Sequence, residues 1–280
     1  WDQRSYWKLC LEVTMSSPFG KSGKGGIFYG WWLLAAGTAI LVIHGGVFTY
    51  GFAAFFLPLA AALGTSRAAI SLAFSFTRLE NGLLGPIEGF FIDRFGPRKM
   101  LFVGFAMFGL GFLLFSLVKT LVGFYLVFAF MALGASMAGF LPVVTAVTNW
   151  FSRKRGAATG ISAAGVNIGG MLVALVALAI ATFDWRATAV GIGILVWVLG
   201  FPLSAMIRHR PQPYGYLPDG DLPARTVSSN SPTTTIRDGH SLPNTSLYSI
   251  TVHEALRAPA FWLISSTHAM AVFVVSAVMV

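Results

Sequence analysis

Charged residues are scarce in this chain. Only 10% of its 280 residues are Asp, Glu, Lys or Arg, and 10 acidic residues stand against 19 basic ones. Any cluster of charges in such a sequence is therefore conspicuous. Cysteine is scarcer still, because Cys10 is the single one. One cysteine excludes an internal disulfide framework and a metal site built from several cysteines.

The residue patterns of common enzymes are missing as well. His253-Glu254 is not followed by the second histidine of a zinc-binding helix. The Gly-x-Ser-x-Gly elbow of a serine hydrolase does not occur in the sequence. We therefore expect no enzymatic activity, no metal site and no cofactor.

Apolar residues dominate instead. They make up 56% of the chain, with 25 Phe, 31 Gly and a mean hydropathy of +0.73. They gather in runs of roughly 20 residues, the length at which a helix crosses a bilayer. The sequence therefore predicts an all-α, multi-spanning membrane protein. Its helices are expected at 28–58, 68–92, 99–118, 121–149, 156–182, 185–207 and 258–280. The first of them is expected to be broken by Gly45-Gly46 and Gly51.

Two polar segments lie outside this pattern. Residues 1–27 form a lead-in rich in Gly, Ser and Lys, and residues 208–257 hold six prolines and a Ser/Thr run. Such a composition has too little apolar surface to pack as a domain, so we expect a linker at 208–257. Residues 28–207 then form a six-helix bundle, and 258–280 is the first helix of a second bundle.

The basic residues are unevenly distributed between alternate turns. After the sixth helix come Arg208 and Arg210, whereas the opposite turns hold one basic residue each. The turns between helices 2 and 3 and between helices 4 and 5 hold three each: Arg94, Arg98, Lys99, Arg153, Lys154 and Arg155. Basic loops stay on the cytoplasmic side, so the N-terminus is predicted to be cytoplasmic. The net charge of +9 is then explained by topology and anionic lipid rather than by nucleic acid.

The turn between helices 2 and 3 has a distinct motif, Gly-x-x-x-Asp-Arg-x-Gly-x-Arg. Its residues are Gly89, Asp93, Arg94, Gly96 and Arg98. A turn selected only for positive charge would not need Gly89, Asp93 or Gly96. A small residue such as Gly89 lets a neighbouring helix approach closely, and Gly96-Pro97 cannot continue a helix.

This motif resembles the loop between helices 2 and 3 of the major facilitator superfamily of secondary transporters. Pro97 departs from the family, which often has a basic residue there. The resemblance implies two six-helix halves joined by a linker, each half a pair of inverted repeats. On this reading the chain is one half plus a seventh helix, a fragment of a 12-helix protein. The resemblance also implies that the five motif residues gate the conformational change, with Asp93 placed at a helix N-terminus.

Two further stretches narrow the resemblance. Phe28-Tyr29-Gly30-Trp31-Trp32 begins the first helix, and Trp150-Phe151-x-x-Lys154-Arg155-Gly156 spans the turn between helices 4 and 5. Both look like the monocarboxylate and oxalate/formate transporter group. That group typically has a proton- and substrate-binding lysine in the outer half of helix 1. This chain has no lysine between Lys24 and Lys99, and Tyr50 falls near that place.

Polar residues within the second span are the first candidates for a site. Arg78, Asn81, Gly85 and Glu88 follow helical spacing and share one stripe. Arg78 lies deep in the span, where a charge must face the bundle interior or a water-filled path. Its planar guanidinium suits a carboxylate, so we predict that Arg78 and Asn81 bind an anionic substrate. The alternative is a permanent ion pair of Arg78 with Glu88 or Glu80.

Three further residues complete the predicted substrate site. His44 lies in the middle of the first span and either carries a proton or forms an interior hydrogen bond. Tyr50 follows it along the same helix, and Asn167 lies on a glycine-rich face of helix 5. The glycines of that face are expected to pack closely against another helix.

We interpret the chain as part of a secondary active transporter of a small organic anion, a carboxylate, in the cell membrane. Its partners are the anionic substrate, the lipid bilayer and the C-terminal half of the same protein, with proton coupling left open. Two alternatives remain at this stage. One is a transporter of another class of molecule, such as a drug or sugar, and the other is a non-transporting scaffold or receptor on the same fold.

Overall fold

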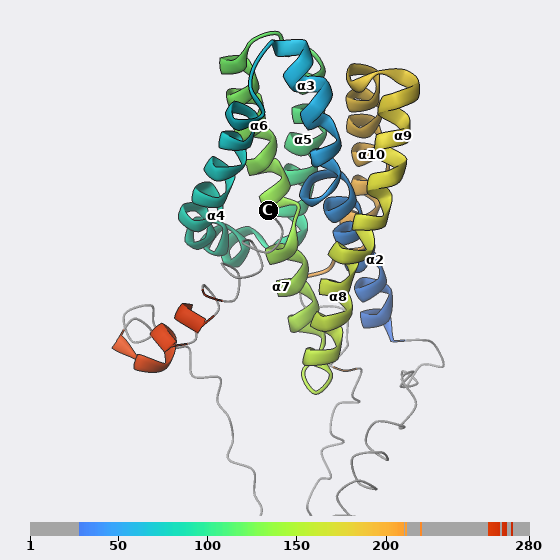
Figure 1. The fold of residues 1–280 in the computed structure, drawn as a ribbon. Coiled ribbons are helices and arrows are strands. Elements are labelled where there is room, and N and C mark those ends of the chain that lie inside the picture. The colour runs from blue at the N-terminus through green and yellow to red at the C-terminus, as the bar shows by residue number, and fades with distance from the viewer. Residues whose placement is uncertain are drawn as a thin grey trace, which may run out of the picture. The chain divides into compact units, whose positions relative to one another are not determined.

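The computed structural model describes residues 28–209, 211, 219, 257–263, 265–267 and 270, without the side chains of 74–83 (Figure 1). All elements in this part of the chain are helical. In order they are α2 (Tyr29–His44), η1 (Gly45–Thr49), η2 (Gly51–Phe55), α3 (Phe56–Leu63), α4 (Arg67–Phe95), α5 (Pro97–Ser116), α6 (Leu121–Met137), α7 (Phe140–Trp150), α8 (Arg155–Gly169), η3 (Gly170–Leu172), α9 (Val173–Phe183) and α10 (Trp185–Met206).

Five stretches of these helices are long and apolar enough to cross a membrane. They are Tyr29–Leu63, Pro97–Ser116, Leu121–Trp150, Arg155–Phe183 and Trp185–Met206. The second expected span, α4, is long enough at 29 residues but does not qualify among the described residues. Its sequence holds Arg78, Glu80 and Glu88, which lower its mean hydropathy. The all-helical, multi-spanning fold class is confirmed.

The chain divides into two compact units, residues 1–225 and residues 226–280. The first unit holds the bundle. In the second, 259–263 and 265–267 are helical, at the start of the helix expected over 258–280. The rest of that helix, the lead-in 1–27 and most of the linker 208–257 lie outside the described residues.

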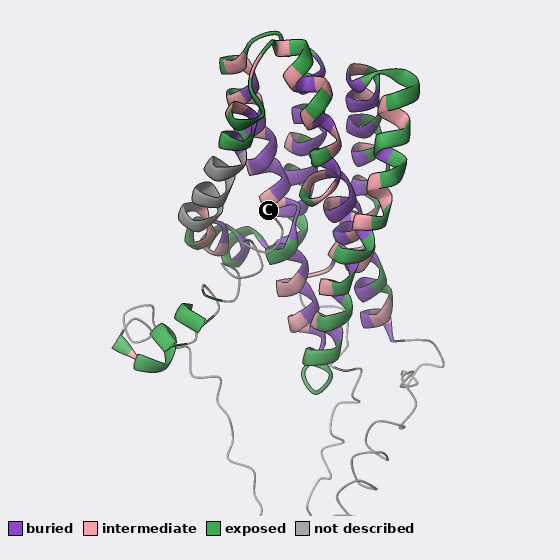
Figure 2. Cartoon of the chain, viewed as in Figure 1, coloured by how far each residue is buried: buried purple, intermediate pink, exposed green. Residues whose placement is uncertain are grey.

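The core of the first unit is largely aromatic. The buried face of α5 follows helical spacing with Phe105, Phe108, Phe112 and Phe115, each at most 1% exposed. Phe52 of η2 adds ring contacts at 4.8 Å to Phe128 and 5.2 Å to Phe115. Figure 2 shows these buried faces turned inward. These phenylalanine side chains therefore form a shared core between helices 1, 3 and 4.

Large apolar side chains also cover the outside of the bundle. They include Met171 on η3 and Leu175, Leu178 and Phe183 on α9, all more than 60% exposed. Figure 2 shows α9 exposed along much of its length. An apolar exterior of this kind is unsuited to water and is what a bundle immersed in lipid or covered by a further domain requires.

Three predicted helices are interrupted halfway, and the break predicted in the first at Gly45-Gly46 and Gly51 is confirmed. The first runs through α2, η1, η2 and α3, the fourth breaks between α6 and α7, and the fifth changes to η3 between α8 and α9. The prediction that the first helix ends near Pro58 is wrong, because it continues to Leu63. Pro58 is tolerated there because it lies in the first turn of α3, where its missing N–H is not needed.

The two ends of the bundle differ in their side-chain contacts. One end, here called the basic end, holds the α4/α5 turn, the α7/α8 turn and residues Ile207–His209. At the opposite end Arg186 donates to the carbonyls of Ser116 at 2.8 Å and Val118 at 3.1 Å. Its guanidinium also lies 4.5 Å from the centre of the Trp185 ring. Arg186 therefore ties the start of α10 to the end of α5, a role beyond its charge.

Candidate functional site

Helices 1 and 5 approach each other through glycine. A Cβ atom on Gly45 would collide with the backbone of Val166, and one on Gly169 would collide with the carbonyl of Val42. A Cβ on Gly165 would lie 2.8 Å from the Thr38 carbonyl oxygen. The close packing expected for the glycine-rich face is therefore present at the point where both helices are interrupted. Residues at these interruptions are brought within hydrogen-bonding distance.

Two of the predicted substrate residues meet there. The hydroxyl of Tyr50, between η1 and η2, donates to Oδ1 of Asn167 on α8 at 2.9 Å. Tyr50 is half-buried and Asn167 is exposed. No other hydrogen bond of the Asn167 side chain occurs within the described part of the chain, so its amide N–H groups remain available to a ligand.

His44 is placed apart from this pair. It is the last residue of α2, with Nδ1 3.4 Å from the Thr49 hydroxyl and its ring 5.9 Å from that of Phe48. The other side of its ring faces the backbone of Ala135 and the position of Gly139. His44 therefore lies against the interruption of helix 4, with the interior hydrogen bonds that one of the two predictions for it described.

Glu88 reaches the same interruption from α4. Its side chain is only 6% exposed, and its carboxyl group contacts the Ser136 hydroxyl. Its Oε1 atom has no hydrogen-bond partner among the described residues. We considered Glu88 only as an ion-pair partner of Arg78, and the contact with Ser136 was missed. The sequence does show an acidic residue within a long helix, but it does not show which neighbouring helix the side chain would contact.

Arg78 and Asn81 lie on α4, but their side chains are outside the described residues. The neighbouring glycines of that helix face open space. A Cβ on Gly85 or on Gly89 would meet nothing within 4 Å. The expected close approach of a helix at Gly89 is therefore not seen in the first unit, and this surface of α4 is uncovered by it.

The Gly-x-x-x-Asp-Arg-x-Gly-x-Arg motif between helices 2 and 3 forms a sharp turn at the basic end. Gly96 has φ +83°, a conformation that favours glycine, and Pro97 begins α5. Asp93, Arg94 and Arg98 are exposed. Asp93 lies in the last turn of α4 and not at a helix N-terminus, so the expected dipole contact is wrong within this unit. A Cβ on Gly96 would lie 3.5 Å from Cγ of His209, after the sixth helix.

The two aromatic stretches that the sequence singled out pack on each other. The rings of Phe28 and Tyr29 lie 5.8 and 5.4 Å from that of Trp150, and those of Trp31 and Phe151 are 5.3 Å apart. These stretches are about 120 residues apart in the sequence, so their contact was not predictable from either alone. They join the start of helix 1 to the α7/α8 turn.

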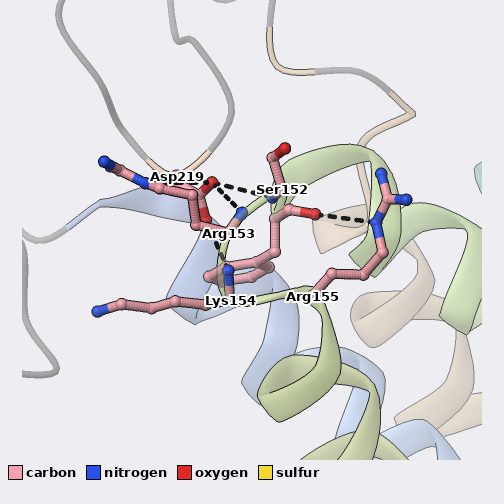
Figure 3. A network of polar contacts seen from close by, with 6 residues as sticks. Ser152, Arg153, Lys154, Arg155 and Asp219 are labelled. Atoms are coloured by element: carbon pink, nitrogen blue, oxygen red, sulfur yellow. Dashed lines mark hydrogen bonds and ion pairs between the residues drawn. The ribbon is translucent and has the colours of Figure 1, made fainter. Parts of the chain in front are cut away.

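The α7/α8 turn also forms hydrogen bonds with Asp219, a residue that the sequence did not single out. Oδ2 of Asp219 accepts the backbone N–H groups of Ser152 at 3.0 Å and Arg153 at 2.7 Å (Figure 3). Its Oδ1 accepts that of Lys154 at 3.5 Å. Arg155, the remaining basic residue of the turn, donates to the Phe151 carbonyl at 3.4 Å. The basic residues of this turn are thus part of an ordered network as well as a topological signal.

Comparison with known proteins gives this fold a family context. A family model described as Major Facilitator Superfamily matches residues 27–280. The oxalate:formate antiporter of Oxalobacter formigenes is 29% identical over 155 residues, 55% of this chain and 37% of that protein. The membrane sensor protein UhpC of Salmonella typhimurium is 31% identical over 160 residues, 56% of this chain and 36% of that protein.

A third relative is the fujikurins efflux protein of Gibberella fujikuroi. It is 35% identical over 89 residues, 32% of this chain and 19% of that protein. The matched part of this chain therefore spans about a third or less of the length of each of these relatives.

Proposed function

Because the chain belongs to the Major Facilitator Superfamily of transporters, we propose that it carries a small organic anion, a carboxylate, across the cell membrane by alternating access. Membership of that family makes it a multi-pass membrane transporter of small molecules and not an enzyme. On our proposal residues 28–207 are the N-terminal half of the transporter, 208–257 are the linker, and 258–280 begin the second half.

The hydrogen bond between Tyr50 and Asn167 carries the proposal. It joins the interrupted parts of helices 1 and 5, and transporters bind substrate where helices are discontinuous near the bilayer midplane. The Tyr50 hydroxyl donates its one proton to Oδ1 of Asn167, which orients the amide so that its N–H groups can donate to a carboxylate. Arg78 and Asn81 on α4 and His44 on α2 complete the proposed site, with Arg78 as the cation for the substrate charge.

The choice of a carboxylate is supported by the relative named as an oxalate:formate antiporter. The relatives named as an efflux protein and as a membrane sensor protein support the two alternatives, another substrate class or a receptor. The carboxylate is preferred because an arginine in the middle of a helix that crosses the membrane needs an anionic partner, and a two-oxygen anion matches its geometry.

For the orientation, we propose that the basic end faces the cytoplasm, since basic turns are retained there. The motif residues Gly89, Asp93, Arg94, Gly96 and Arg98 then lie at the cytoplasmic end. The surface of α4 left uncovered at Gly85 and Gly89 is where we place the C-terminal half of the transporter. Gating by the motif would act at that boundary.

The proposal is tested by substrate-induced stabilisation of the full-length protein in detergent. A panel of mono- and dicarboxylates is added, and the melting temperature is followed. Tyr50→Phe should lower the affinity for the best carboxylate about 5- to 10-fold, because the neutral hydrogen bond that orients the Asn167 amide is lost. Tyr125→Phe is the matched control, because its hydroxyl donates to the Ala69 carbonyl away from the site.

Arg78→Gln should abolish the carboxylate-induced shift while the protein stays folded. Arg78→Lys should bind more weakly than the wild type, because an ammonium cannot make two parallel hydrogen bonds. A wild-type protein stabilised by none of the carboxylates would refute the substrate class. A stable Arg78→Gln protein with an unchanged shift would remove Arg78 from the site.

A further inference from the structure

The chain returns to the basic end after the sixth helix and is fixed there at successive points. The Trp150 indole donates to the Arg208 carbonyl at 3.0 Å, and the Asn149 amide donates to the His209 carbonyl at 3.1 Å. Further along the chain, Asp219 contacts the turn that follows Trp150. Arg208 and His209 therefore lie against the end of helix 4, and Asp219 lies against the turn that leads into helix 5.

The contact at Asp219 is made mainly by backbone N–H groups. Three consecutive donors, Ser152, Arg153 and Lys154, point to one carboxylate (Figure 3). The Asp219 side chain is 6% exposed, whereas that of Arg153 is 72% exposed and its Nε lies 4.0 Å away. An exposed ion pair of that length contributes little. The charge-assisted backbone hydrogen bonds hold Asp219 in place.

This carboxylate lies at the start of helix α8 and holds mainly the turn that leads into it. Helix α8 starts at Arg155, and its N-cap residue, Lys154, makes no side-chain capping hydrogen bond. The first N–H groups of a helix lack partners within the helix, and a negative charge there is stabilised by the helix dipole. Asp219 caps α8 through the Lys154 N–H at 3.5 Å, from 65 residues further along the chain, and its shorter bonds anchor Ser152 and Arg153 just before the helix.

The backbone at Asp219 is itself in a costly conformation. Its φ is +61°, in the left-handed region that residues other than glycine rarely adopt. Among the described non-glycine residues only Asp184 shares a positive φ, at +71°, and it also caps a helix, α10. A strained conformation that persists only through its contacts is a common feature of switch regions.

We infer that Asp219 is a positioning residue of the transport cycle, which biases the orientation of helix 5 by capping it from the linker. The inference rests on the proposed function, because it assumes that the linker joins two halves that move against each other. Helix α8 carries Asn167 and packs through glycine against helix 1. A change at its start is therefore transmitted to the Tyr50–Asn167 pair.

A contact present in one orientation and absent in the other shifts the balance between them by its own free energy. Each tenfold shift in the ratio of two states requires about 1.4 kcal/mol. A merely structural cap would instead stabilise both orientations equally and leave their ratio unchanged. Loss of Asp219 should therefore change the ratio of the two orientations if it is a positioning residue, and the stability alone if it is a structural cap.

The test uses the full-length protein in proteoliposomes with a reporter cysteine. Cys10 is replaced by serine, and Ile161→Cys on α8, 47% exposed, reports access from each side through impermeant maleimide. Asp219→Asn is compared with Asp184→Asn, which removes a carboxylate cap at the opposite end, where Oδ2 accepts the Arg186 N–H at 3.4 Å. The measured quantities are the ratio of labelling rates from the two sides, the melting temperature and the turnover.

Asp219→Asn should change the labelling ratio at least threefold and lower turnover at least fivefold. Asp184→Asn should lower the melting temperature alone. If Asp219→Asn leaves the labelling ratio as it is in the wild type, the inference is wrong and Asp219 is only a cap. The labelling ratio needs no substrate, so a failure of the carboxylate proposal would not be mistaken for a failure of this one.

A second measurement fixes the contact covalently. The pair Asp219→Cys and Ser152→Cys, with Cys10→Ser, is cross-linked by a short bifunctional methanethiosulfonate reagent, and its transport is compared with that of the same double-cysteine protein before cross-linking. Cross-linking should stop the transport that this protein retains, and a reducing agent should return transport to the level before cross-linking. Transport unchanged by the cross-link, or no cross-link at all, would contradict a contact that is made and broken during the cycle.

Discussion

Glu88 shows at the scale of a single residue how the interior of the bundle differs from a purely apolar core. Its carboxyl group contacts Ser136, and its Oε1 atom has no partner among the described residues. A buried charge without a cation is costly, and a buried polar atom without a hydrogen bond also costs free energy. The uncharged amide of glutamine should satisfy Ser136 at least as well.

We therefore expect Glu88→Gln to leave the melting temperature unchanged or raised. Glu88→Ala should lower the stability by about 1–3 kcal/mol, because Ser136 loses its partner and a cavity remains. Thermal unfolding of the full-length protein measures both, and Ser136→Ala serves as the complementary variant. Equal losses for Gln and Ala would mean that the charge itself is required, through a cation outside the described residues.

At the scale of the elements, the packing of helix 5 against helix 1 is set by backbone approach. Gly169 lies so close to the Val42 carbonyl that a methyl group has no room. Gly160, on the same helix α8, has nothing within 4 Å of the position of a Cβ. The two glycines therefore offer a matched pair of substitutions.

Gly169→Ala should destabilise the protein by about 1–3 kcal/mol, since an added methyl group forces the two backbones apart. It should also weaken substrate binding, because Tyr50 and Asn167 lie across the same contact. Gly160→Ala should be neutral or stabilising by about 0.5–1 kcal/mol, the usual gain in a helix. Thermal unfolding compares the two, and similar effects at both positions would argue against close packing at Gly169.

The helices themselves were predictable because apolar runs and turn residues are local signals. Gly64, with φ +59°, ends α3, and the Ser66 hydroxyl caps α4 by accepting the Ala69 N–H at 3.2 Å. The break in the first helix was predicted from Gly45-Gly46 and Gly51, which are local signals. The breaks in the fourth and fifth helices were not predicted, because glycine is also common in continuous membrane helices and each break depends on a neighbouring helix.

The site was predictable in part. Tyr50 and Asn167 were both chosen from the sequence, but their hydrogen bond depends on the relative rotation of two helices, which no local pattern records. The same is true of Ser136 opposite Glu88 and of the α7/α8 turn opposite Asp219. Contacts between distant segments depend on how all the helices of the bundle pack together. The periodicity of a single helix does not predict them.

At the scale of the whole molecule, the two ends of the bundle are chemically different. Arg98 and Lys154 are exposed at the basic end, and Lys119 is exposed at the opposite end. If the basic end is cytoplasmic, a cysteine at Arg98 or Lys154 should resist an impermeant maleimide in intact cells. A cysteine at Lys119 should react. The background is Cys10→Ser, and permeabilised cells control for folding. The reverse pattern would invert the proposed topology.

The proposed C-terminal half would contribute the other part of the substrate site, because transporters of this architecture bind between their halves. The residues described here therefore account for one wall of that site. Its interrupted helices, the Tyr50–Asn167 hydrogen bond and the uncovered surface of α4 all belong to the same half.

The most direct test of the account is carboxylate transport by the purified full-length protein. Proteoliposomes are loaded with unlabelled oxalate, formate or another small carboxylate, and uptake of the labelled compound is followed. We expect uptake that saturates, exceeds that of protein-free liposomes and is strongly reduced by Tyr50→Phe but not by Tyr125→Phe. Uptake no faster than in protein-free liposomes for every carboxylate, by a protein that is folded and correctly inserted, would contradict the account.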